Sequence, residues 1–296
     1  MNSGRNKESR TNAKTGRRAG AKLLLTAKKT GIHAGKLLLD LLYPPRCPIC
    51  DQILSRREGL CCNGCEKKLP WIVGPVCMKC GKMIEREEDE YCEDCRKYAH
   101  VFTRGTAAFA YTGAMRHSVY RMKAENRRDY LDFYADAMAQ ALEPYLMRWQ
   151  PERIIGVPMH WQKKWKRGYN QSELLARKLA ERTGIQMEGS WVSCCKKTKA
   201  QKTLNRKERE KNLSGCYTLR KSEKCFRSVL IVDDVYTTGS TVDELARTLK
   251  KAGAEQVYFI VLCIGKGSGN GKKRVCTEQN VCYTKSESGY FQRRNR

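Results

Sequence analysis

Two neighbouring carboxylates, Asp233 and Asp234, stand between an apolar run and a short loop of hydroxyl and glycine residues. The apolar run, residues 229–232, is mostly β-branched and predicts a strand that is buried on both faces. Residues 242–251 have apolar positions at helical spacing and stop near Gly253, so they predict a helix. The order is therefore a strand, an acid pair where that strand should end, a loop and a helix.

This order predicts a site for a sugar phosphate. The N–H groups that open a helix are unpaired and carry the positive end of its dipole, so they suit a phosphate. Carboxylates accept hydrogen bonds, so Asp233 and Asp234 suit ribose hydroxyls or a Mg²⁺ beside them. An ordinary turn followed by a helix cap is the alternative, but strand, acids and loop all agree on the ligand site. The residues expected to hold the phosphate are Thr237, Thr238, Gly239, Ser240 and Thr241.

Eight of the sixteen cysteines form four Cys-x-x-Cys pairs, which indicates metal binding in a reducing compartment. Two pairs that are separated by eleven residues form one set, and the same set recurs thirty residues later. The repeat predicts two structural Cys₄ zinc sites, whose metal supplies folding energy to a segment with few apolar residues. Sequential ribbons fit the repeat best, interleaved ligation uses the same residues, and Cys61 could substitute in the first site. The expected ligands are Cys47, Cys50, Cys62, Cys65, Cys77, Cys80, Cys92 and Cys95.

The net charge of +27 is extreme and uneven. Residues 1–46, 191–227 and 266–296 carry +9, +9 and +6 of it. Such an excess favours polyanionic partners, nucleic acid first, although solubility and disordered tails explain part of it. Residues 191–227 are too charged for a core and predict either a basic flap over a polyphosphate or part of a nucleic-acid surface.

Residues 159–172 alternate cations with aromatic residues. Trp161, Trp165 and Tyr169 recur every four residues, so one helix would place them on a single stripe that suits stacked bases of a single strand. Packed tryptophans beside solvated lysines are the equal alternative. His160 fits a structural hydrogen bond better than a catalytic base. Possible contacts to polyphosphate or DNA are Lys163, Arg167, Lys196 and Lys197.

The pattern predicts an α/β fold with a doubly wound, mostly parallel sheet, preceded by a small zinc-ribbon domain. We expect a basic, partly disordered segment with a short helix over residues 1–40, a double zinc ribbon over 41–100, the α/β domain over 101–265 and a basic disordered tail over 266–296. The basic helix predicted at 21–43 either packs on the next domain or lies on a membrane surface. The chain has neither a signal-peptide core nor an apolar run of ~20 residues, which predicts a cytoplasmic protein.

Four features in this order resemble the ComF family, which joins a zinc-binding segment to a phosphoribosyltransferase-type domain. They are the zinc knuckles, Val-Pro-Met-His followed by Arg-Gly-Tyr-Asn-Gln-Ser within 157–172, Thr-Lys-Ala-Gln-Lys-x-Leu-Asn-Arg-Lys-Glu-Arg at 198–209, and Asp-Asp-Val-Tyr-Thr-Thr-Gly-Ser-Thr at 233–241. The last is similar to the 5-phosphoribosyl-1-pyrophosphate (PRPP) loop of type I phosphoribosyltransferases. The resemblance covers about residues 40–265.

The resemblance implies that Asp233 and Asp234 are catalytic residues that hold the ribose hydroxyls, with Mg²⁺ as cofactor, and that residues 237–241 hold the 5′-phosphate. It also implies a role in DNA uptake during natural transformation, with single-stranded DNA and an uptake helicase or membrane machinery as partners. The alternative is a metabolic, amidophosphoribosyltransferase-like enzyme with an unidentified acceptor. Cys194 departs from the family pattern, which usually has Arg at this position.

Overall fold

The computed structural model describes residues 43–55, 58–189, 191–197, 205–220, 226–265, 283–285 and 291–293. The chain divides into two compact units, residues 1–46 and 47–296, and the elements described below belong to the second. The helix predicted within residues 21–43 lies outside the described residues, apart from Tyr43. Among the described helices, none combines the length and the apolar content needed to cross a bilayer.

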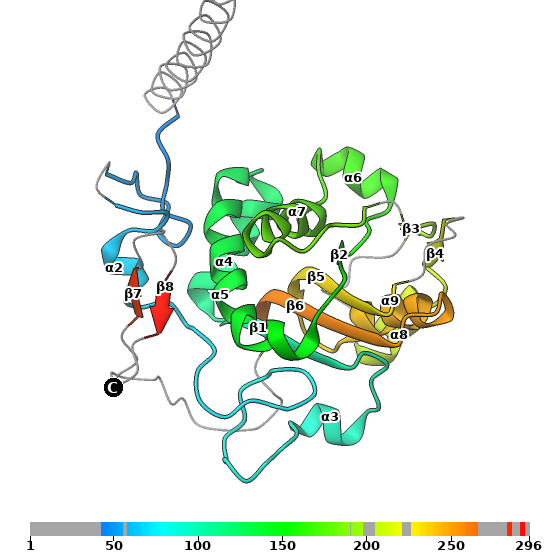
Figure 1. The fold of residues 1–296 in the computed structure, drawn as a ribbon. Coiled ribbons are helices and arrows are strands. Elements are labelled where there is room, and N and C mark those ends of the chain that lie inside the picture. The colour runs from blue at the N-terminus through cyan, green and yellow to red at the C-terminus, as the bar shows by residue number, and fades with distance from the viewer. Residues whose placement is uncertain are drawn as a thin grey trace, which may run out of the picture. The chain divides into compact units, whose positions relative to one another are not determined.

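Four parallel strands form the central sheet, in the spatial order β1, β6, β5, β2 (Figure 1). The two strands that come last in sequence are inserted between the first two, so the sheet is wound in both directions from its centre. The central strands are almost entirely buried, as a parallel sheet covered on both faces requires. The predicted fold class is confirmed. The strands are β1 (Arg104–Ala110), β2 (Arg153–Gly156), β5 (Ser228–Tyr236) and β6 (Gln256–Ile264).

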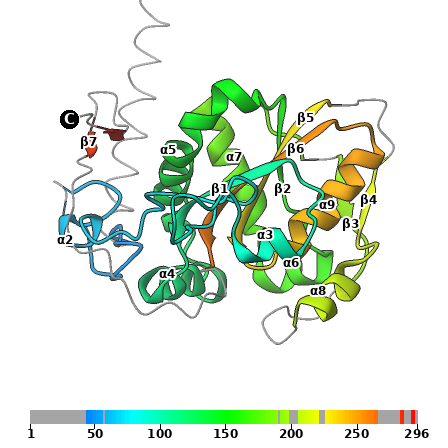
Figure 2. The same cartoon turned by 90° about the horizontal axis from the view of Figure 1, so that it is seen from below.

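Helices cover both faces of this sheet (Figures 1 and 2). On one face, Leu230 and Ile260 of the sheet share a core with Met138 of α5 and Leu175 of α7. On the other face, Phe259 and neighbouring sheet residues pack against the apolar side of α9. The helices are α4 (Gly113–Ala124), α5 (Leu131–Trp149), α7 (Gln171–Thr183) and α9 (Ser240–Lys251), with a short 3₁₀ turn, η1, at Arg128–Tyr130.

The basic segment 191–227 is partly a packed structure and not only a charged surface. Trp191, Leu213 and Cys216 are buried in the core on the α9 face. The prediction that the whole segment is too charged for a core was therefore wrong, because several of its described apolar residues turn inward. Its elements are β3 (Val192–Cys194), α8 (Arg206–Leu213) and β4 (Tyr217–Leu219), with β3 and β4 antiparallel. Residues 198–204 and 221–225 lie outside the described part.

The predicted tail, residues 266–296, contains two short strands within its described residues. Strand β7 (Tyr283–Lys285) pairs antiparallel with β8 (Phe291–Arg293).

The segment between the two cysteine clusters completes the edge of the sheet. Ile72 N donates to Ala108 O at 3.0 Å, Ala110 N donates to Pro70 O at 2.8 Å, and Trp71 pairs with Phe109. The outer edge of β1 is therefore hydrogen-bonded and not open to another chain.

The two zinc-ribbon segments lie on opposite faces of the sheet. The first contributes Cys47 and Cys61 to the core that contains α5 and α7, whereas the second contributes Cys77 and Cys80 to the core that contains α9. Each segment has one short helix that begins directly after a cysteine. These helices are α2 (Asn63–Glu66) and α3 (Glu93–Lys97).

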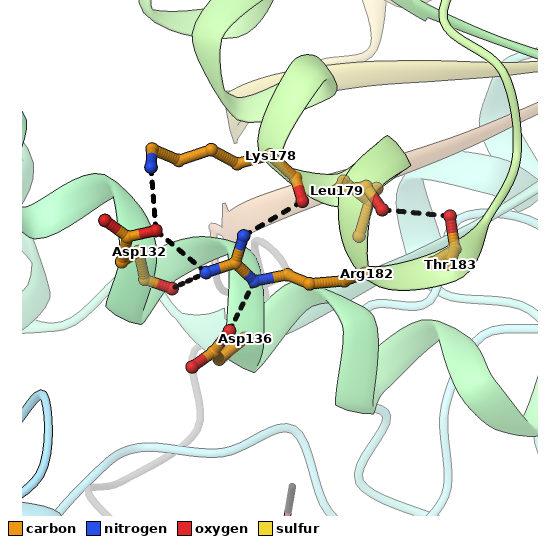
Figure 3. Close-up of polar contacts among 6 residues, drawn as sticks. All are labelled: Asp132, Asp136, Lys178, Leu179, Arg182 and Thr183. Atoms are coloured by element: carbon orange, nitrogen blue, oxygen red, sulfur yellow. Dashed lines mark hydrogen bonds and ion pairs between the residues drawn. The ribbon is translucent and has the colours of Figure 1, made fainter. Parts of the chain in front are cut away.

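An ion-pair network joins α5 to α7 (Figure 3). Asp132 accepts from Lys178 at 2.7 Å and from Arg182 at 2.9 Å, and Arg182 also donates to Asp136. Burial alone would raise the pKa of Asp132, but the ion pairs with Lys178 and Arg182 outweigh it and lower the pKa. The network therefore favours the charged form of Asp132 and links the two helices that cover one face of the sheet.

We expect Arg182→Ala to lower the free energy of unfolding by about 1–3 kcal/mol, because it leaves two partly buried carboxylates without their main partner. Urea unfolding at pH 7 measures this difference. Arg177→Ala, an exposed arginine on the same helix, is the control and should change stability by less than about 0.5 kcal/mol. Equal effects of the two variants would contradict a structural role for the network.

Candidate functional site

The acid pair lies within strand β5 and not after its end. The ladder with β6 continues past the carboxylates, with Asp233 opposite Val261 and Tyr236 opposite Ile264. The expectation that the strand stops before the acids was therefore wrong. Aspartate is unfavourable in strands, but here the pairing with β6 overrides that local preference. The backbone of the acid pair is consequently held by the sheet.

Three side chains hold the two carboxylates. Ser172 Oγ donates to Asp233 Oδ1 at 2.7 Å, and Gln171 Nε2 donates to Asp234 Oδ2 at 2.7 Å. Lys123 Nζ, near the end of α4, lies 2.6 Å from Asp234 Oδ1. Both oxygens of Asp234 are thus engaged by the protein. Asp233 Oδ1 also accepts from the N–H of Asp234, at 2.9 Å.

Burial and the neighbouring charge of Asp234 raise the pKa of Asp233 to about 7. The hydrogen bond from Ser172 and the charge of Lys123 oppose this rise without cancelling it. The pair therefore changes its charge state near neutral pH, and a cation beside Asp233 would favour the ionised form.

The motif at residues 167–172 supports the acid pair. Asn170 caps α7 by accepting from Ser172 N at 3.1 Å, and its amide donates to Val157 O at 2.9 Å. Arg167 donates to Gln171 Oε1, which orients the amide that holds Asp234. The motif thus brings the start of α7 to the end of β2 and presents Gln171 and Ser172 to β5.

The predicted aromatic stripe does not form. Helix α6 (Trp161–Arg167) ends at Gly168, which has a left-handed conformation with φ of 83°. Tyr169 therefore lies beyond the helix and is buried, with its hydroxyl donating to Met122 O. Trp161 and Trp165 remain 67% and 84% exposed. His160 caps this helix by accepting from Gln162 N at 3.3 Å, which confirms its structural role.

The loop at 237–241 joins β5 to the start of α9. Gly239 is the N-cap of α9 and has φ of 85°, a conformation that glycine adopts without strain. Thr238 Oγ1 and Ser240 Oγ are 2.9 Å apart, and Thr237 Oγ1 accepts from Arg209 Nη1 at 2.8 Å. The loop thus combines hydroxyls, the opening N–H groups of a helix and one guanidinium, which is a favourable set for a phosphate.

The four predicted cations lie in different settings. Arg167 reaches the acid pair through Gln171. Lys163 is exposed on α6, and Lys196 and Lys197 are exposed just after β3.

Cys194, the residue that departs from the family pattern, lies beside two of these cations. Contact with the Cys216 thiol, the Lys196 backbone and the charge of Lys163 outweigh burial and lower the pKa of Cys194 to about 7.

Sequence reasoning missed the roles of Lys123, Gln171, Ser172 and Arg209. Lys123 stood in a polar loop whose default interpretation was a solvated face. Gln171 and Ser172 belong to the motif at 167–172, and Arg209 ends the motif at 198–209. The motifs therefore marked the right segments, but the contacts depend on how distant elements meet.

Each expected set of cysteines is brought together, one set in each zinc-ribbon segment. Within each set of four, the ligand atoms lie within 4.8 Å of one another. Tetrahedral zinc with Zn–S bonds of about 2.3 Å requires sulfur atoms about 3.8 Å apart. The separations of 3.8 Å for Cys50–Cys62 and 3.7 Å for Cys80–Cys92 match this value. The sites are sequential and not interleaved, and Cys61 lies beside Cys47 at 3.6 Å without joining the set.

We expect Asp233→Asn to raise the melting temperature of the protein at pH 8 when Mg²⁺ is absent and zinc is retained. The pKa of Asp233 is about 7 in the folded protein against about 3.9 unfolded, so wild-type stability falls as pH rises through this range, and the loss is complete above pH 7. The amide of the variant does not titrate and so does not lose stability in this way. The difference in melting temperature between variant and wild type should therefore disappear towards pH 4. Thermal unfolding from pH 4 to 8 checks this, with the exposed Glu125→Gln as control. A gap that does not change with pH would contradict the raised pKa.

Comparison with known proteins gives two family matches. Residues 38–96 match the double zinc ribbon domain, and residues 170–284 match the phosphoribosyl transferase domain. A solved purine phosphoribosyltransferase from Pyrococcus horikoshii is 23% identical, with a TM-score of 0.28, covering 45% of this chain and 73% of that one.

Three curated relatives are similar in sequence to part of the chain. Competence protein F of Haemophilus influenzae is 40% identical over 109 residues, 36% of this chain and 48% of that protein. DNA utilization protein YhgH of Escherichia coli K12 is 38% identical over 113 residues, 38% of this chain and 49% of that protein. Competence protein ComFC of Streptococcus pneumoniae is 26% identical over 153 residues, 51% of this chain and 64% of that protein.

The aligned part of the chain spans about half the length of the first two relatives. The cysteine clusters and the parallel sheet agree with the two family matches. The chain therefore contains a double zinc ribbon followed by a phosphoribosyltransferase-type domain, and it is similar to proteins that are named for competence and DNA utilization.

Proposed function

We propose that the chain binds PRPP or a related sugar phosphate and serves DNA uptake in the cytoplasm by holding single-stranded DNA. The observation that carries the first half is the acid pair fixed in β5 beside a glycine loop that opens α9. The names of the relatives, which refer to competence and DNA utilization, support the second half. An uptake helicase or membrane machinery is the partner class that this role requires.

In this proposal the ribose hydroxyls lie against Asp233, and the 5′-phosphate lies on the loop at 237–241. Both oxygens of Asp234 are bonded to Lys123 and Gln171, so the role of Asp234 is to hold the acid pair in place. Mg²⁺, when bound, would neutralise the pyrophosphate and help it leave. Arg209, already bonded to Thr237, supplies positive charge at the loop.

Helix α6 is the proposed contact for single-stranded DNA. Its two tryptophans are exposed, which is costly in water and suits stacking with bases. Lys163, Lys164 and Lys166 surround them on the same short helix and suit the phosphates of the strand. The predicted stripe was lost, but two of its three aromatics remain available.

A metabolic phosphoribosyltransferase, resembling the amidophosphoribosyltransferases, is the second candidate. The acid pair beside an intact glycine loop favours it, because these are the groups that would hold the ribose and its 5′-phosphate while pyrophosphate leaves. Such an enzyme would release pyrophosphate from the anomeric carbon through an oxocarbenium-like state and needs no covalent nucleophile.

We expect the double variant Asp233→Asn with Asp234→Asn to lose PRPP binding by at least about 100-fold, because each lost charged hydrogen bond costs about 1.5–3 kcal/mol. Calorimetry with Mg²⁺ present measures the affinity. Glu125→Gln, an exposed acid outside the pair, is the control and should bind like the wild type. Unchanged binding in a double variant that still unfolds cooperatively would overturn the site assignment.

We expect Trp165→Ala to weaken binding of an oligonucleotide of about 20 nucleotides by roughly 5–100-fold, the range of one base stack. The affinity of the wild type should fall steeply with salt, with a log–log slope of about −0.7 per phosphate contact. Fluorescence anisotropy between 50 and 300 mM salt tests both. Met147→Ala, an equally exposed apolar residue on α5, is the control. A flat salt dependence would count against DNA binding.

A further inference from the structure

The end of the second zinc-ribbon segment is bonded to the first turn of α9. His100 Nδ1 lies 2.6 Å from Asp243 Oδ2, and Val101 N donates to Asp243 Oδ1 at 2.8 Å. Asp243 is buried and stands four residues after the glycine that opens the helix. Both oxygens of this carboxylate are therefore used to tie α9 to the chain that follows α3.

Gly239 of the loop rests directly on this junction. A Cβ atom at this position would lie 2.6 Å from the Tyr236 hydroxyl and 2.9 Å from His100 Cε1. Both separations are shorter than real side chains tolerate, and the φ of 85° adds strain for any other residue. The conformation of the loop is thus shaped from beneath by Tyr236 and His100.

His100 has one ring nitrogen to spare. Its Nδ1 is paired with Asp243, whereas Nε2 is buried and has no hydrogen-bond partner among the described residues. The side chain is only 1% exposed and stacks on Phe102 at 4.8 Å. A buried nitrogen without a partner costs free energy. When both ring nitrogens carry a proton, Nδ1 donates to Asp243 and Nε2 can donate to a phosphate oxygen at the loop, which would relieve that cost.

The same ribbon segment supports Tyr236 from the other side. Lys82 is buried, pairs with Asp94 and lies 5.8 Å from the centre of the Tyr236 ring. Lys82 follows Cys80 by two residues, and Asp94 stands between Cys92 and Cys95, so the second set of cysteines fixes both partners. The first ribbon segment packs on the opposite face of the sheet and makes no such contact within the described residues.

We propose that the second zinc ribbon is part of the phosphate site, with His100 as a residue that positions the loop and offers Nε2 to the bound phosphate. This inference rests on the proposed sugar-phosphate site. It means that the metal held by Cys77, Cys80, Cys92 and Cys95 sets the order of residues 237–243, whereas the metal held by the first four cysteines does not.

The first test compares two substitutions of His100. His100→Ala removes both ring nitrogens, and we expect PRPP affinity to fall about tenfold, the size of one hydrogen bond to a charged group. His100→Asn keeps an amide near the Nδ1 position but lacks Nε2, so it should restore loop order and recover only part of the affinity. Calorimetry gives the affinity, and amide hydrogen exchange at 237–243 gives the order of the loop.

The second test needs no PRPP. It compares substitutions of two cysteines that hold equivalent positions in the two metal sites. Cys95→Ser should speed hydrogen exchange at 237–243, and Cys65→Ser, its counterpart thirty residues earlier, should leave this exchange unchanged. Zinc content per chain, measured on both proteins, establishes that each has lost one ion.

The outcomes separate this inference from the proposed function. If the wild type does not bind PRPP, the proposed function fails, and the exchange experiment still decides whether the ribbon orders the loop. If the wild type binds PRPP but both His100 variants bind it as tightly as the wild type does, the inference is wrong. Full recovery of affinity by His100→Asn would remove Nε2 from the site and also contradict it. Equal exchange in the two cysteine variants would overturn the difference between the ribbons.

Discussion

Two carboxylates side by side in a buried strand are the constraint on which the candidate site depends. Each charge has been taken out of water, and their mutual repulsion adds to that cost. Lys123 and Gln171 bond to Asp234, and Ser172 bonds to Asp233. Those three groups come from α4 and α7, which are far apart in sequence. The packing of both helices on one face of the sheet is therefore a condition for holding the acid pair in the buried strand.

The same constraint explains why several specific contacts fix the segment before α7. A glycine ends α6, an asparagine caps α7, and Arg167 orients the amide of Gln171. Together these features fix the position of the first turn of α7. A shift of the helix by one residue would move Gln171 and Ser172 away from β5, so the carboxylates would lose their hydrogen bonds.

Much of the fold was predictable, because strong local patterns agreed with the tertiary structure. The apolar run at 229–232 and the helical spacing at 242–251 both appear as expected, and the thirty-residue cysteine repeat predicted two sequential metal sites. The acid pair broke the pattern, since strand β5 continues through it. Aspartate usually marks the end of a strand, and only the partner strand β6 shows that the ladder goes on.

The residues that sequence reasoning missed share one physical property. Lys123 and Arg209 look like surface cations in their own segments, and their partners lie 111 and 28 positions away. The prediction that Tyr169 lies on an exposed helical stripe was wrong for a different reason. A spacing of four predicts one helical face only if the helix continues, and the left-handed Gly168 ends it. Local spacing contains no information on either point.

The strip of chain between the two ribbons has a consequence for the protein without its metals. Residues 70–72 occupy the hydrogen-bonding edge of β1, and they are held there between two cysteine clusters that few apolar residues support. Release of zinc would free this strip and leave a parallel sheet with an exposed, apolar outer strand. Residues 70–72 therefore protect this edge from pairing with another chain, and the two metal sites on either side of them would help to keep them in place.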